Sequence, residues 1–153
     1  MLNEWALLGL LEEKRKIFVE IEKITEPMLY VQVEVLEECM KNRESLLAEV
    51  REIDQKIDYR IDGQEAMKQA LKHNCERQQL SAGLAALYDA SLQVKAVVNR
   101  IIQNESGIRL HLEAEKDRIR GELEKMSQSS SSVASQYYST VQRATSHEIE
   151  KKL

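Results

Sequence analysis

The chain has 153 residues, 31% of them charged, and a formal net charge of −4. One proline and five glycines leave little turn chemistry, so the composition argues against a sheet and favours helices joined by few turns. The charges form no basic stripe, which disfavours nucleic-acid binding. The longest apolar run, 5–11, is far shorter than the roughly 20 residues that cross a bilayer, and no basic region precedes it, so we expect neither membrane insertion nor a secretory signal.

The first predicted element is an amphipathic helix over residues 2–24. Its apolar residues mostly recur every three or four positions, at Trp5, Leu8, Leu11, Ile17, Ile21 and Ile24. Pro27 then indicates either a kink or the start of a new helix, because proline is tolerated in the first turn of a helix and not in its interior. Residues 30–35 alternate like a strand but have nothing to pair with, so we expect helix or a tight corner there.

The second predicted helix covers residues 36–61. Arg43 occupies the one position of its seam that is not apolar, and the other seam residues are Leu36, Cys39, Leu46, Val50, Ile53 and Ile57. This stripe is too narrow to stabilise an isolated helix, so it requires a partner helix. Asp62, Gly63 and Glu65 indicate a break with a variant capping box.

A short helix with Ala66, Met67, Ala70 and Leu71 on one face is predicted next, followed by a corner at 80–83 and a long helix over 84–126. Glu105 and Glu115 interrupt the seam of the long helix, which otherwise contains Leu84, Leu87, Val94, Val98, Ile101, Ile108, Leu112, Ile119 and Met126. Because the chain reverses between the two long helices, they should run antiparallel, with Leu46, Val50, Ile53 and Ile57 against Val94, Val98, Ile101 and Ile108. The predicted fold class is all-α: an elongated antiparallel helical bundle, or a coiled-coil-like hairpin of long helices, forming a domain over residues 1–126.

Residues 127–153 are predicted to be a separate region, a serine-rich hinge followed by a short C-terminal amphipathic segment. Serines at 127 and 129–132 end the long helix, because serine competes for backbone hydrogen bonds. A weak apolar stripe follows, and tyrosine is enriched where proteins meet partners. The predicted partner-binding residues are Val133, Tyr137, Tyr138 and Val141; the alternative is a solvated tail.

Residue patterns for chemistry are scarce. His73, His111 and His147 stand apart, whereas metal ligands on one helix recur at i and i+3 or i+4. The sequence has no glycine-rich phosphate loop and no nucleophile elbow. We therefore predict no enzyme, no catalytic residue, no metal and no cofactor. Cys39 and Cys75 are expected to be reduced thiols of a cytoplasmic protein.

Two stretches resemble a known family. The sequence "EKITEPMLYVQVEVLEECMKNRESLLAEVREIDQKID" is similar to the N-terminal half of flagellar type III export chaperones of the FlgN/FliT kind. The residues that match are Leu36, Arg43, Glu44, Leu46, Leu47, Val50, Ile53 and Asp54. The C-terminal half is also similar, because a long helix with "NESGIRLHLEAEKDRIRGELEKM" leads into a polar break and the tyrosine pair 137–138. The serine-rich tail departs from the family pattern.

The resemblance implies a cytoplasmic chaperone without ATPase activity. It would bind the C-terminal helical segment of hook–filament junction or filament-cap subunits, prevent their premature assembly and deliver them to the export gate. Its expected partners are those flagellar hook-associated or cap subunits and an export gate component, with a second copy of the chain as a further option. The main alternative is a structural coiled-coil spacer or dimerisation protein without a dedicated client, and an enzyme built on a four-helix bundle ranks behind both.

Overall fold

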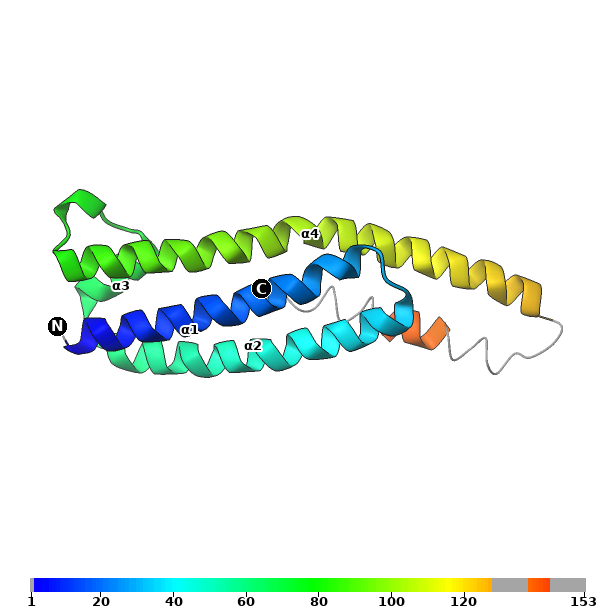
Figure 1. Ribbon diagram of the computed structural model, residues 1–153, viewed down its shortest axis with the longest axis horizontal. Coiled ribbons are helices and arrows are strands. Elements are labelled where there is room, and N and C mark those ends of the chain that lie inside the picture. The colour runs from blue at the N-terminus through cyan, green and yellow to red at the C-terminus, as the bar shows by residue number, and fades with distance from the viewer. Residues whose placement is uncertain (1, 128–137, 144–153) are drawn as a thin grey trace. The chain divides into compact units, whose positions relative to one another are not determined.

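A computed structural model describes residues 2–127 and 138–143 (Figure 1). These residues are helical or form turns and contain no strand, which confirms the predicted all-α class. In chain order the helices are α1 (Leu2–Thr25), η1 (Glu26–Leu29), α2 (Val33–Ile61), α3 (Glu65–Lys72), η2 (Arg77–Gln79) and α4 (Ala82–Met126). A short helical segment at 138–143 comes after them.

Local chemistry explains the turn between α1 and α2. Pro27 lies in the short 3₁₀ helix η1, and its carbonyl accepts hydrogen bonds from the amides of Tyr30 and Val31 at 3.1 and 3.2 Å. The question that proline raised in the sequence is therefore settled as a full turn between two helices. The alternating stretch 30–35 is divided between this turn and the first residues of α2.

The turns before and after α3 depend on residues with a positive φ and not on proline. Gly63 adopts a φ of +73°, a conformation that glycine reaches without a Cβ penalty. The predicted capping box is wrong, because Gln64 precedes the helix and caps it with no side-chain hydrogen bond. At the other end His73 takes the left-handed conformation, with its amide bonded to the Ala70 carbonyl at 3.2 Å. The amide of Asn74 reaches the Gln69 carbonyl at 3.0 Å, which completes a Schellman motif without glycine.

The chain forms two compact units. Unit 1 contains residues 1–22 and 45–100, and unit 2 contains residues 23–44 and 101–153. Helices α1, α2 and α4 each contribute a segment to both units. Helix α4 ends at Met126, as predicted, and the division of the chain into two regions at this residue stays a prediction.

Unit 1 has a continuous apolar core. Its segments of α1, α2, α3 and α4 meet in one cluster formed by Leu7, Leu11, Ile53, Ile57, Met67 and Leu87. Ion pairs join α1 to its neighbours: Lys14 lies 2.6 Å from Asp54 on α2, and Glu22 lies 2.7 Å from Arg100 on α4. Within this unit α2 runs opposite to α1 and α4 (Figure 1), so the predicted antiparallel arrangement of the long helices is confirmed here.

Several predicted seam positions are displaced by one residue. Leu47 and Val97 are buried, whereas Leu46 and Val98 are only half-buried. On α1, Trp5 was expected in the apolar face but is 74% exposed. The prediction assumed a seam between two helices, but in unit 1 each long helix faces two others. A helix with two partners buries a wider stripe, and the centre of that stripe is shifted from a two-helix seam.

Unit 2 pairs the start of α2 with the C-terminal part of α4. Leu36 packs with Ile108, Leu112 and Met28, so Ile108 does not belong to the seam predicted for it. Farther along the same pair, Val33 packs with Ile119. Leu36 contacts Ile108 and Leu112, whereas the earlier residue Val33 contacts the later residue Ile119. The two segments are therefore antiparallel in this unit as well. Met126, predicted in the seam, is 37% exposed.

Candidate functional site

The short segment 138–143 is docked on unit 2. Its central residue, Val141, is 0% exposed and packs against Val33 of α2 and Ile119 of α4, with Leu123 beside them. We call the surface formed by Val33, Ile119 and Leu123 the docking groove. Two antiparallel helices thus supply an apolar surface, and a short helix from the same chain packs on it.

Polar groups flank the docked segment at both ends. At its start, a hydrogen bond with Gln142 and another with Arg120, aided by the charges of Lys116 and Arg120, lower the pKa of Tyr138. At its end, Arg143 lies 3.8 Å from Glu37 of α2, with side chains 64% and 27% exposed. An exposed pair at this distance contributes about 0–1 kcal/mol, so the contact orients the segment more than it holds it.

The sequence predicted four partner-binding residues in this region. Val133 and Tyr137 lie outside the described residues. Tyr138 is half-buried and Val141 is fully buried, and both belong to the docked segment. The structure therefore brings two of the four together, on a surface of their own chain, and their contact with a partner remains a prediction.

The residues that receive the segment were not recognised as a site from the sequence. Val33 belonged to the alternating stretch without an assigned role, and Ile119 was assigned to the seam with α2. Glu37, Lys116 and Arg120 resemble the many other surface charges, so no sequence signal distinguishes them. Their common location depends on the antiparallel pairing of α2 with α4, which brings positions more than eighty residues apart together.

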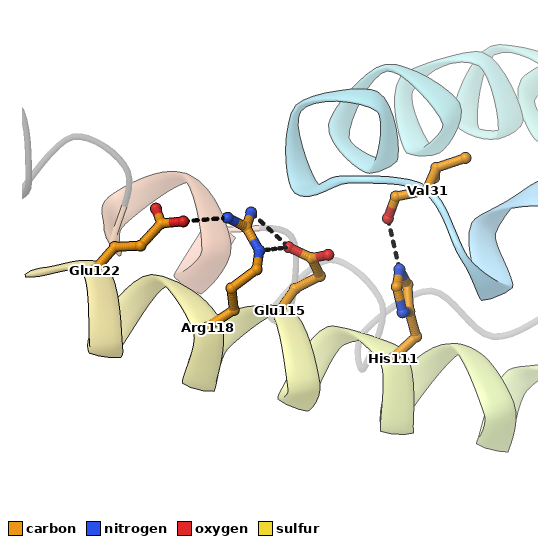
Figure 2. A network of polar contacts seen from close by, with 5 residues as sticks. All are labelled: Val31, His111, Glu115, Arg118 and Glu122. Carbon is orange, nitrogen blue, oxygen red and sulfur yellow. Dashed lines mark hydrogen bonds and ion pairs between the residues drawn. The ribbon is translucent and has the colours of Figure 1, made fainter.

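A polar network fixes the turn next to the groove. Figure 2 shows His111 of α4 directed at the backbone carbonyl of Val31, with a separation of 2.5 Å from Nε2. A carbonyl can only accept, so Nε2 must carry the hydrogen. This bond holds the turn before α2 against α4 and thereby sets where Val33 enters the groove.

The same figure shows how Glu115 is accommodated. Glu115 is largely buried and accepts from Nε and Nη2 of Arg118 at 2.9 and 2.7 Å, while Nη1 of Arg118 reaches Glu122 at 2.7 Å. The hydrogen bond with Glu115 raises the pKa of Arg118. A carboxylate that interrupts an apolar seam is thus neutralised one turn farther along its own helix.

The other two seam anomalies, Arg43 and Glu105, neutralise each other. Nη2 of Arg43 donates to Glu105 at 2.9 Å, and the two side chains are only 6% and 19% exposed. Nη1 of Arg43 lies 3.4 Å from the sulfur of the buried Met28. This pair crosses from α2 to α4 inside unit 2, and a buried charge pair of this kind permits one alignment of the two helices.

One serine–histidine contact has the appearance of a catalytic pair. His73 Nε2 lies 2.6 Å from Ser91 Oγ, but the Ser91 hydroxyl donates to the Tyr88 carbonyl at 2.9 Å. The histidine must therefore donate to the serine, which is the reverse of what a general base does. Among the described residues, no group of three or more His, Cys, Asp or Glu side chains could hold a metal ion. Within the same residues, no helix is both long and apolar enough to span a bilayer.

No protein-family model, curated protein or solved structure matches this chain significantly.

Proposed function

We propose that the protein is a cytoplasmic export chaperone of the FlgN/FliT kind. It binds the C-terminal helical segment of hook–filament junction or filament-cap subunits, prevents their premature assembly and delivers them to the export gate. The observation that carries this proposal is the burial of Val141 between Val33 and Ile119, because it means that unit 2 has a surface suited to a short amphipathic helix.

The docked segment acts as an exchangeable cover in this proposal. A helix as short as 138–143 is marginal in water, so its stability depends on the surface that it covers. Displacing it opens the docking groove to a client helix and releases Tyr138 toward the gate. Clients of this type expose amphipathic ends that stay disordered until they assemble, so a groove that accepts a helix meets their chemistry.

The proposal is tested by mixing the purified chain with purified junction and cap subunits from the same organism. Each subunit is used intact and without its C-terminal segment, and the mixtures are analysed by size-exclusion chromatography with light scattering. We expect a stable complex with at least one intact subunit and none with its truncated form. Failure of every intact subunit to bind at micromolar concentrations would rule the client assignment out.

A dimerising spacer remains the second candidate, and one feature of unit 1 favours it. Trp5 and Tyr59 are 74% and 85% exposed, and Tyr59 lines a hollow of about 600 Å³ together with Leu10 and Lys56. Large exposed aromatic side chains are typical anchors of protein–protein contacts. If the chain alone is a concentration-independent dimer that Trp5→Ser converts to a monomer, and no client binds, the spacer function replaces the chaperone.

A further inference from the structure

We propose that the docking groove selects its ligand helix by three features in a fixed order. These are a hydrogen-bond acceptor or acidic group, an aliphatic side chain three residues later, and a basic side chain two residues after that. The inference rests on the proposed function, in that it takes the groove to be the client site, and it adds the chemical pattern that a client must carry.

The aliphatic position is read from Val141. Its side chain is fully buried and packs with the aliphatic side chains of Val33, Ile119 and Leu123. A polar side chain in this place would lose its hydrogen bonds to water without replacement. The groove therefore accepts valine or a residue of similar size and rejects a polar one.

The acceptor position is read from Tyr138, three residues earlier. Its hydroxyl hydrogen-bonds with Gln142 of the same segment and with Arg120 of α4, and the charges of Lys116 and Arg120 also help to lower the pKa of Tyr138. Arginine has only donors to offer, so a phenol oxygen meets its minimum requirement and a carboxylate would meet it better. The ligand position that follows this pattern is thus filled best by glutamate or aspartate.

The basic position is read from Arg143, whose guanidinium faces Glu37 at 3.8 Å. Acidic and basic requirements at opposite ends of the groove also fix the ligand's direction. A helix is stabilised by negative charge near its N-terminus and positive charge near its C-terminus. The order demanded by Arg120 and Glu37 is the order that supports a short helix, so binding and helix formation favour the same ligand.

The test uses the full-length chain with Val141→Ser, which weakens the internal cover and leaves the groove residues unchanged. The probe is a fluorescent synthetic peptide with the sequence of residues 133–147, and binding is followed by anisotropy. We expect the variant to bind the peptide about twofold more tightly than the wild type, because an occupied groove lowers the apparent affinity. Val141→Ala is the second opening variant if Val141→Ser does not fold. Equal affinity of opened and wild-type chains, or no binding by either, overturns the inference.

Peptide variants read the three positions separately. The peptide with Val141→Ser should show no measurable binding, and the peptide with Tyr138→Glu should bind about threefold more tightly at low salt, with the gain lost at high salt. The peptide with Arg143→Glu should bind about threefold more weakly. Peptides that bind equally well whatever their sequence would contradict a selective groove.

A charge reversal on both partners distinguishes specific recognition from nonspecific binding. In the opened chain, Glu37→Lys should restore the binding of the Arg143→Glu peptide and weaken that of the unchanged peptide. Glu34→Lys, on the same helix and without a place in the groove, is the matched control and should restore nothing. If both reversals act alike, Glu37 does not read the basic position and the pattern is wrong.

The outcomes also distinguish this inference from the proposed function. If the peptide variants bind in the expected order of affinity but no junction or cap subunit forms a complex, the selective groove is supported and those subunits are ruled out as clients. If a complex with an intact subunit persists when the charges of Glu37 and Lys116 are both reversed, the chaperone function is supported. The docking groove is then ruled out as the site that selects the client.

Discussion

Unit 1 joins four helical segments through one apolar cluster and places its ion pairs Lys14–Asp54 and Glu22–Arg100 at the margins. Unit 2 instead encloses a charged pair, Arg43 and Glu105, and covers part of its apolar surface with the short segment 138–143. The first arrangement derives most of its stability from buried apolar area. The second depends on one alignment of two helices and is covered by a short helical segment, which is compatible with the proposed opening for a partner.

The largest expected effect is in the core of unit 1. Val97→Asp would place an unpaired charge at a buried position of α4 and should lower the free energy of unfolding by about 3 kcal/mol or more. Val98→Asp is the matched control. Val98 is the next residue and is only half-buried, so this change should cost about 1 kcal/mol. Urea unfolding followed by circular dichroism measures both. Equal losses would mean that the buried stripe of α4 is not centred on Val97.

The buried pair of unit 2 should give the next largest effect. Arg43→Met alone leaves Glu105 in a largely enclosed site and should destabilise by about 2–4 kcal/mol. The double change Arg43→Met with Glu105→Leu should recover most of this loss, because two apolar side chains then face each other. A double-mutant cycle in urea tests the coupling. Additive losses would show that the two charges do not stabilise each other.

Two glycines of α4 within unit 2 should respond oppositely to alanine. Nothing lies within 4 Å of a Cβ at Gly121, so Gly121→Ala should stabilise by about 0.5–1 kcal/mol through helix propensity. A Cβ at Gly107 would lie 2.7 Å from a methyl group of Leu29, so Gly107→Ala should give no such gain. Thermal unfolding of the two variants compares them directly, and an equal gain at both positions would contradict the close approach of η1 to α4.

The smallest expected effect is at the cover of unit 2. Val141→Ser should change the free energy of global unfolding by about 0.5 kcal/mol or less, although Val141 is fully enclosed. The loss cannot exceed the docking free energy of the segment, and a segment that opens locally contributes little to global stability. A loss of about 2 kcal/mol in urea unfolding would mean that 138–143 is an integral part of the core.

The sequence was sufficient for the fold class and for the long helices, because a period of 3.6 residues and the turn residues Pro27 and Gly63 are local signals. It was also sufficient to mark Arg43, Glu105 and Glu115 as interruptions in otherwise apolar seams. It could not pair Arg43 with Glu105 or Glu115 with Arg118, since a pattern along one helix does not identify which charge neutralises another.

The docking groove shows the same limit for function. The apolar stripe that contains Val141 could be predicted from the sequence. The surface against which this stripe packs could not. Val33 and Ile119 become neighbours only through the antiparallel pairing of α2 with α4. A one-residue shift in the buried stripe, as at Val97, is likewise decided by the third helix of unit 1 and not by the period of α4.

The central claim is that 138–143 is a reversible cover on unit 2, and amide hydrogen exchange of the full-length chain tests it most directly. We predict that the amides of 139–143 exchange at least about a hundredfold faster than those around Leu112 in α4, which open only with the whole helix. Val141→Ser should speed exchange further in this segment and leave Leu112 unchanged. Protection of 139–143 equal to that around Leu112 would show that the segment is a fixed part of the bundle and would contradict the account.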